Sequence, residues 1–158
     1  MARGKSVGMP SAPTGADDDL PDHLFRWSDA LGRRLSREMR AIAPPDLEAI
    51  GGRRARLLQI IPADGLRVTD LASRAGVTKQ AIGQLVDTLE ELGLVQSSPS
   101  ESDRRVRWVA RTLAGDAVVD QTLALIAEAE DRLRAEVGRA RYDAMLVTMR
   151  ELGRDVTW

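Results

Sequence analysis

The sequence predicts a mainly α-helical protein with one small antiparallel β-hairpin near its centre. Long segments on both sides of the centre repeat apolar residues at intervals of three and four, the period of an amphipathic helix. Between Gly93 and Thr112 the period changes to two, which indicates paired strands. The chain has 158 residues but one Phe, one Tyr and three Trp, so its core must be mainly aliphatic, which favours helices over a β-sandwich.

The N-terminal part is expected to begin with a tail and to continue as one long helix. Residues 1–16 are rich in Gly, Ser, Pro and Ala and show no periodicity, so we expect a flexible tail there. From Leu20 to Ile42 apolar residues recur at helical spacing, and Pro44 and Pro45 end the run. This segment is expected to be a long amphipathic helix.

Residues 46–68 are expected to hold smaller elements. A short turn precedes Gly51 and Gly52, and Arg53–Ile61 has the composition of a buried helix that ends before Pro62. Gly65 makes a turn into Arg67–Val68, where a third short strand could pair with the hairpin.

Two short helices joined by a tight turn are expected between Val68 and Gly93. Thr69 is the expected N-cap of the first helix, which ends at Gly76. Thr78 is the expected N-cap of the second helix, which ends at Gly93. The buried face of the second helix is a set of apolar residues at helical spacing: Ile82, Leu85, Val86, Leu89 and Leu92.

The hairpin is expected directly after the second helix. Leu94–Gln96 is the first strand, Ser97–Ser102 a loop and Val106–Thr112 the second strand. Two helices, a tight turn and a hairpin in succession form a winged helix-turn-helix, and we call the hairpin the wing. We expect residues 46–112 to form this domain.

Two further amphipathic helices are expected after Gly115, separated at Gly138. Together with the first long helix they carry more apolar surface than a compact winged helix of this size can cover. We therefore expect residues 17–45 and 113–158 to form the dimerisation region of a homodimer. Packing of the three helices within one chain is the alternative.

The exposed face of the second helix suits base edges and phosphates, because its side chains are small or able to hydrogen-bond. The candidate DNA-binding residues on this helix are Thr78, Lys79, Gln80, Gly83, Gln84 and Thr88. The wing adds a candidate contact to the minor groove, in which Asp103 would orient the guanidinium of Arg105. The candidate residues of the wing are Asp103, Arg104, Arg105 and Arg107.

These residues occur in a spacing that also points to a family. The features that match are Leu71-Ala72, Gly76, Leu85-Val86-Asp87, Leu89-Glu90, Gly93-Leu94-Val95, Asp103-Arg104-Arg105, Thr112 and Gly115. With them, the central third of the chain resembles the MarR family of bacterial transcription regulators. The resemblance implies a homodimer that binds a pseudo-palindromic operator in double-stranded DNA, commonly as a repressor relieved by a small-molecule effector.

The resemblance also implies a site for a small aromatic or anionic effector between the dimer helices and the winged domain. The candidates for that site are His23, Trp27, Arg53 and Arg54. Three residues depart from the family pattern. Gly83 and Gln84 stand where a hydroxyl residue and an Arg are more frequent, which bears on the operator sequence, and Arg111 replaces the Leu that usually closes the wing strand.

Overall charge gives no argument for nucleic acid as a partner, since the chain has 23 basic and 24 acidic residues. Basic and acidic residues are also equal in number between Val68 and Thr112. Only segregation could create a basic surface, and the pattern fits it, because Lys79 and the wing arginines lie apart from Asp87, Glu90 and Glu91.

Other classes of function find little support in the sequence. The chain has no Cys, which excludes thiol-based sensing, and one imidazole, His23, without ligand spacing around it, so neither a metal site nor a cofactor is expected. No constellation of catalytic residues is recognisable, and we expect no enzyme. No segment resembles a membrane span or a signal peptide, which predicts a cytoplasmic protein. The alternative function is a winged helix that binds another protein and not DNA.

Overall fold

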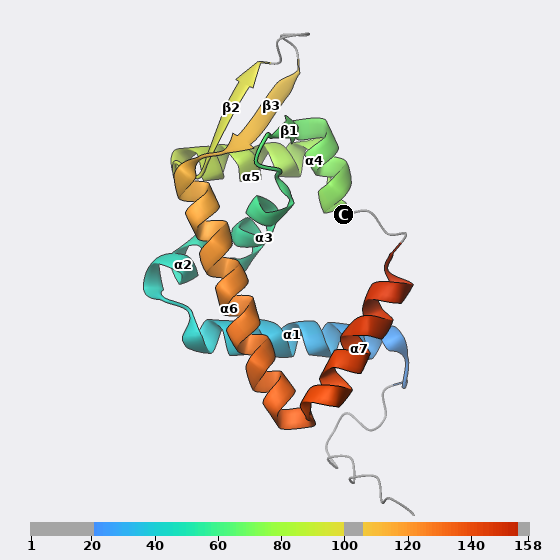
Figure 1. Ribbon diagram of the computed structural model, residues 1–158. Helices are drawn as coiled ribbons and strands as arrows, with labels where there is room; N and C mark the ends of the chain where they lie inside the picture. Colours follow the sequence, from blue (N-terminus) through green and yellow to red (C-terminus); the bar gives the residue numbers. More distant parts are fainter. Residues whose placement is uncertain (1–20, 100–105, 155–158) are drawn as a thin grey trace, which may run out of the picture.

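The computed structural model describes residues 21–99 and 106–154. The expected N-terminal tail and the wing residues Asp103, Arg104 and Arg105 lie outside the described residues. Figure 1 shows a winged-helix end and a helical end joined by one long helix. The elements in chain order are α1 (Leu24–Ile42), α2 (Pro45–Ile50), α3 (Gly52–Ile60), β1 (Leu66–Arg67), α4 (Val68–Ala75), α5 (Lys79–Glu91), β2 (Val95–Pro99), β3 (Arg107–Arg111), α6 (Leu113–Val137) and α7 (Arg139–Leu152).

The long amphipathic helix α1 begins later than its apolar pattern predicts. It starts at Leu24, because the imidazole of His23 is the N-cap and accepts a hydrogen bond of 3.2 Å from the Arg26 N–H. It packs across α6, and Arg34 binds Glu136 of α6 with an Nη2···Oε2 distance of 2.7 Å. The helix ends at Ile42, before the expected proline pair.

The helix-turn-helix forms as expected except at two positions, the start of α4 and the end of α5. The prediction that Leu92 lies on the buried face of the second helix is wrong, because α5 ends at Glu91 and Leu92, its C-cap, is 50% exposed. The prediction of Thr69 as the N-cap of α4 is wrong, because the helix already begins at Val68 with Arg67 as its cap. Gly76 ends α4 in the left-handed conformation (φ 64°), as its place after the last apolar residue predicts. Thr78 is confirmed as the N-cap of α5, since its hydroxyl oxygen accepts a bond of 3.2 Å from the Ala81 N–H.

The wing belongs to a three-stranded antiparallel sheet in the order β1-β3-β2. Leu66 of β1 pairs with Val109 of β3, so the expected third strand is present. It lies one residue earlier than predicted, because Val68 already begins α4. The prediction of a loop from Ser97 to Ser102 is wrong at its start, because β2 continues through Pro99, which pairs with Arg107. Pairing with β3 keeps this polar segment extended in spite of its loop-like composition.

One aliphatic core joins the helix-turn-helix, the wing base and the start of α6. Val109 is the buried residue of β3, so Arg107 and Arg111, two residues away on either side, share its inward face. The fully buried side chains with the largest volumes are Leu58, Ile61, Leu71, Ile82, Leu89, Val86 and Val109.

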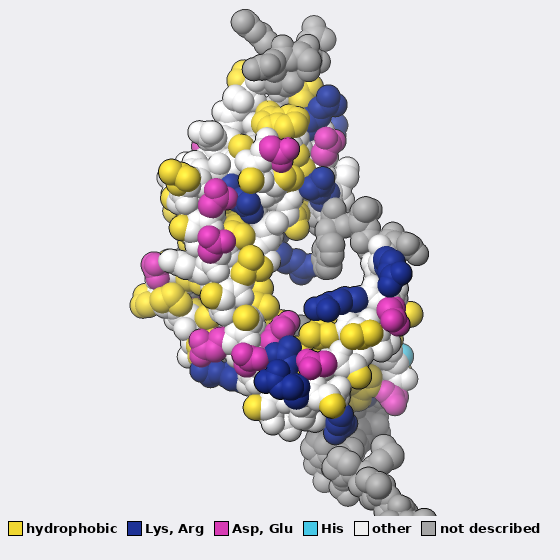
Figure 2. Space-filling view, in the orientation of Figure 1, with side chains coloured by type: hydrophobic (Ala, Val, Ile, Leu, Met, Phe, Trp, Pro, Cys, Tyr) yellow, Lys and Arg dark blue, Asp and Glu magenta, His cyan; other side chains and the backbone are white. Residues whose placement is uncertain are grey.

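The helical end, which comprises α1 and α7, leaves many apolar side chains exposed to solvent. None of the residues of α1, all of which the structure describes, is buried, and Phe25 is 84% exposed. α7 leaves Val147, Met149 and Leu152 exposed in the same way. Figure 2 shows apolar side chains along the surface of α7 and a hollow between α7 and the α3–α6 side of the molecule. Within the described part of the chain, no helix has the length and hydropathy that a membrane crossing requires.

The wing base and α6 meet at a close contact between backbones. The Leu94 carbonyl accepts the Thr112 N–H at 3.1 Å, and the Thr112 hydroxyl donates to the Gly93 carbonyl at 2.7 Å. The same hydroxyl oxygen caps α6 by accepting the Gly115 N–H at 3.1 Å. Gly115 lies so close to Leu94 that a Cβ on Gly115 would overlap the Leu94 carbonyl oxygen.

We expect Gly115→Ala to lower the free energy of unfolding by about 2 to 3 kcal/mol, because the added methyl group meets backbone that cannot rotate away. Gly83→Ala is the control, since a Cβ on Gly83 in the middle of α5 meets no atom within 4 Å. That change should raise stability by about 0.5 to 1 kcal/mol. Denaturant titrations of both variants measure the two effects, and equal stability for Gly115→Ala and wild type would contradict the close contact.

Candidate nucleic-acid interface

The outer face of α5 presents polar side chains from a helix that is firmly fixed on its inner face. Ile82, Val86 and Leu89 are buried in the core. On the opposite side Lys79 and Gln80 are exposed, and the N-terminal end of α5 is therefore accessible. A helix held in this way can enter a groove without losing its own packing.

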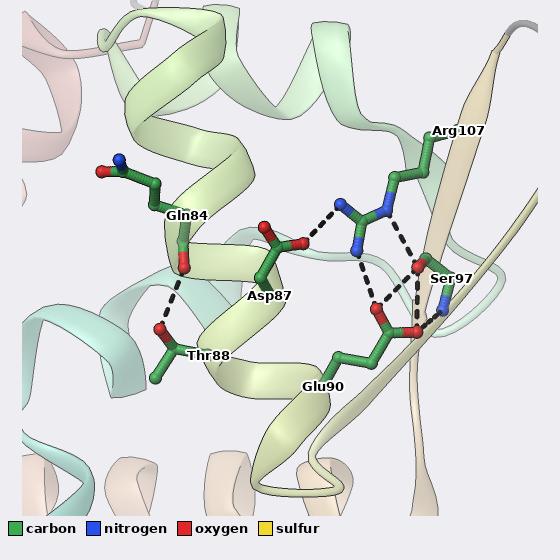
Figure 3. Close-up of polar contacts among 6 residues, drawn as sticks. All are labelled: Gln84, Asp87, Thr88, Glu90, Ser97 and Arg107. Atoms are coloured by element: carbon green, nitrogen blue, oxygen red, sulfur yellow. Dashed lines mark hydrogen bonds and ion pairs between the residues drawn. The ribbon is translucent and has the colours of Figure 1, made fainter.

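The candidate residues on α5 differ in what their polar groups already do. The Thr78 hydroxyl caps the helix, and the Thr88 hydroxyl donates a bond of 2.9 Å to the Gln84 carbonyl oxygen within the helix. The Gln84 side chain is exposed and points away from the helix, on the side opposite the wing in Figure 3. Gly83 is half-buried and adds no side chain. The amides of Gln80 and Gln84 and the ammonium group of Lys79 are therefore the candidate contacts of this face.

Arg107 is the one candidate wing residue that the structure describes, and its guanidinium binds this protein's own groups (Figure 3). Its Nη1 donates to Asp87 Oδ1 at 2.6 Å and its Nη2 to Glu90 Oε2 at 2.7 Å, both on α5. Its Nε donates to the Ser97 hydroxyl on β2 at 2.9 Å. The backbone N–H of Ser97 in turn donates to Glu90 Oε1 at 2.9 Å. We call these four residues the Arg107 cluster.

Charge and hydrogen bonding within the Arg107 cluster favour the ionised groups. The bonds from Ser97, first from its backbone N–H and then from its hydroxyl, lower the pKa of Glu90, and Arg107 adds to this effect. Burial disfavours the charged guanidinium of Arg107, but the bonds to Asp87 and Glu90 outweigh burial and raise its pKa.

The unusual Arg111 is placed at the inner end of the wing. Its side chain is 15% exposed, and its Nε lies 2.8 Å from Asp116 Oδ1 in the first turn of α6. The two atoms form an ion pair without the alignment of a hydrogen bond. Its Nη1 donates to the Leu58 carbonyl of α3 at 3.4 Å. Arg111 thus connects the wing strand with α3 and α6 through polar contacts. A Leu at this position could make only apolar contacts.

A groove of about 1410 Å³ lies beside α3 and separates the winged-helix end from the helical end. Of the four candidate effector residues it includes Arg53. His23 and Trp27 lie near the start of α1 instead, with His23 as the cap and the Trp27 indole N–H bound to Asp22. Arg54 donates to the Ile50 carbonyl at 3.0 Å. The charged residues that line the groove are Arg40, Glu48, Arg53, Arg56 and Arg74.

The winged-helix geometry has a counterpart among known proteins. The family model described as the MarR family matches residues 51–106, from the start of α3 to the far side of the wing. Residues 51–106 are therefore similar to the winged helix of this family. A MarR-family transcriptional regulator from Rhodococcus sp. RHA1 is 25% identical, with a TM-score of 0.65 over 84% of this chain and 94% of the regulator.

Two further solved structures share the fold of this chain. The reduced form of MarR from E. coli has a TM-score of 0.73 at 18% identity, over 85% of this chain and 98% of that one. The transcriptional repressor CouR, bound to a 23-mer DNA duplex, has a TM-score of 0.68 at 23% identity, over 89% and 99%. The match of residues 51–106 and the likeness to a transcriptional regulator agree with the expectation of a regulator drawn from the sequence.

Sequence reasoning missed the partners of Arg107 and Arg111. Asp87 and Glu90 are three residues apart on one helix, a spacing that places both carboxylates toward one side. This spacing could have indicated a site for a cation beside α5. It does not indicate which cation, because Arg107 lies on β3, a different element further along the chain. In the described residues no group of three or more His, Cys, Asp or Glu side chains is arranged to hold a metal ion.

We expect Glu90→Gln to lower the free energy of unfolding at pH 7 by about 1 kcal/mol, a value reduced by the exposure of the site to solvent. Because the folded pKa of Glu90 lies below its ordinary value of 4.5, this contribution is complete above that value and is lost as the pH falls through the lowered pKa. The two proteins should therefore converge in stability in acid. Glu91→Gln is the control and should differ little from wild type at pH 7, whereas a pH-independent loss for Glu90→Gln would contradict the ionised contact.

Proposed function

We propose that this protein is a homodimeric, sequence-specific DNA-binding transcription regulator that acts as a repressor relieved by a small effector. The observation that carries the proposal is the outer face of α5, where Lys79, Gln80 and Gln84 are exposed on a helix whose other face is buried. An α-helix fits the major groove of B-DNA, where each base pair presents a distinct set of donors and acceptors. The DNA duplex bound by CouR, a protein of the same fold, supports the same use here.

The residues on α5 suit different parts of such a complex. A Gln amide can pair with adenine through two hydrogen bonds, so Gln80 and Gln84 are the proposed base contacts. Lys79 at the start of the helix is the proposed phosphate contact, and Thr78, Gly83 and Thr88 let the backbone approach closely. Arg104 and Arg105, which lie outside the described residues, are the proposed minor-groove contacts of the wing, with Asp103 as the orienting partner of Arg105.

A homodimer is proposed because the helical end leaves apolar surface uncovered. Phe25 of α1 and Leu152 of α7 are 84% and 74% exposed, and no residue of the fully described α1 is buried. Exposed apolar patches of this kind mark interfaces. A dimer also gives two copies of α5, as a pseudo-palindromic operator requires.

The effector is proposed to bind in the groove beside α3. Four arginines and one glutamate line it, together with apolar residues such as Leu35, Met39 and Leu125. This combination suits a small anion with an apolar body. Titration of a protein–operator complex with aromatic carboxylates tests the proposal, and release by none of them would argue against this chemistry.

A protein-binding winged helix without DNA binding is the alternative function. A protein partner would require large apolar side chains on the outer face of α5. That face instead consists of Thr78, Lys79, Gln80, Gly83, Gln84 and Thr88, which favours DNA.

We expect Gln84→Ala to weaken binding to an operator selected from random duplexes by about 1 to 3 kcal/mol and to change binding to random DNA little. Lys79→Ala should weaken both by similar factors, because a phosphate contact carries no sequence information. Competition titrations with the two duplexes measure both variants. Equal losses on operator and random DNA for Gln84→Ala would exclude it as a base contact, and an absence of any preferred duplex for wild type would contradict the proposed function.

We expect the double substitution Leu146→Glu and Met149→Glu in α7 to prevent dimer formation, because an apolar interface does not accommodate unpaired carboxylates. Sedimentation equilibrium measures the mass. Leu113→Glu is the matched control, since Leu113 is 88% exposed at the other end of the molecule and a Glu there lies favourably in the first turn of α6. A double variant that remained a dimer would place the interface elsewhere.

A further inference from the structure

The Arg107 cluster fixes the wing at a second point. At the base, the Leu94 carbonyl and Thr112 hold both strands next to the end of α5. The pair Pro99 and Arg107 is the last described pair of the ladder before the tip. Arg107 therefore attaches the far end of the wing to α5. Two separate attachments define an orientation, whereas one would leave a hinge.

The contacts of the cluster have the geometry of a rigid connection. Each of the three guanidinium nitrogens of Arg107 donates to a different residue, at 2.6 to 2.9 Å. Glu90 additionally accepts the Ser97 N–H, a donor on the outer edge of β2, which has no partner strand among the described residues. The planar guanidinium so joins three elements, α5, β2 and β3 (Figure 3).

The same contacts make Arg107 a poor phosphate ligand. The cluster holds one cation and two carboxylates, so its formal charge is negative. A phosphate at Arg107 would have to displace Asp87 or Glu90 and would then lie beside the released carboxylate. The position of Arg107 in the sequence suggests a DNA contact, but its surroundings in the fold do not.

We propose that Arg107 is a positioning residue, which fixes the angle between the wing and α5 so that the two reach neighbouring grooves together. This inference rests on the proposed DNA-binding function. A direct phosphate contact by Arg107 is the competing role, and the two roles predict opposite results for the same substitution.

Asp87→Asn separates the two roles by the sign of its effect. If Arg107 held a phosphate, loss of Asp87 would free the guanidinium and remove a negative charge near DNA, so binding would tighten on every duplex. The positioning role predicts about tenfold weaker binding to the selected operator, with little change on random DNA. Glu91→Gln is the matched control, because it removes an acid from the same end of α5 but outside the cluster. It should tighten binding slightly on both duplexes.

Arg107→Lys and Arg107→Ala give a second test. Lys supplies a point charge but not the planar fork, so it should replace a phosphate contact and should fail to replace a positioning contact. We expect about tenfold weaker operator binding for both variants, with an unchanged slope of log affinity against log salt. Arg105→Ala provides the comparison, since loss of a phosphate contact should lower that slope by about one. Binding by Arg107→Lys at the wild-type level, or a reduced slope for Arg107→Ala, would overturn the proposal.

Amide exchange in the free protein tests the attachment without DNA. Loss of the cluster in Arg107→Lys or Asp87→Asn should speed hydrogen exchange at Ser97 at least several-fold, while exchange in the buried part of α5 stays at the wild-type rate. If wild type selected no operator, the proposed function would fail while Ser97 exchange still reported on the attachment. Unchanged exchange at Ser97 in both variants would overturn the positioning role.

Discussion

The contact of Leu94 with Thr112 and Gly115 is the constraint on which the arrangement of the whole molecule depends. At this point the end of α5, both ends of the wing and the start of α6 meet within a few residues. A side chain larger than hydrogen at position 115 would separate them, because the opposing atom is a backbone carbonyl. The position of α5 relative to the helical end is therefore set by this backbone contact together with the aliphatic core that joins α5, the wing base and the start of α6.

Much of the fold could be predicted from the sequence because its signals are local. The apolar spacing along α5, the cap at Thr78 and the left-handed residue Gly76 act within a few residues of themselves. The errors occur where a distant partner decides. Ser97 has the composition of a loop but lies in a strand, because β3 and Glu90 supply partners that local sequence does not reveal.

The candidate site shows the same division between local and distant effects. Its outer face on α5 follows from helical spacing, and the structure places these residues together at the surface. The roles of Arg107 and Arg111 could not be predicted, because an Arg beside other arginines suggests a solvated or DNA-facing charge. Each is instead matched to acids of another element, Arg107 to Asp87 and Glu90 and Arg111 to Asp116. Arg107 and Arg111 reach these acids because both lie on the inward face of β3, the face of the buried Val109.

The lack of buried residues in α1 has a consequence for its behaviour in solution. Most of the stability of a helix in a protein comes from the packing of its amphipathic face and not from its own propensity. α1 receives part of its support from α6 of its own chain, through contacts such as that between Arg34 and Glu136. In the proposed homodimer the rest of this support comes from the partner subunit. The helical content of α1 then depends on protein concentration, as dimer formation does. Dilution below the dissociation constant of the dimer would unfold α1, while the winged-helix core stays folded.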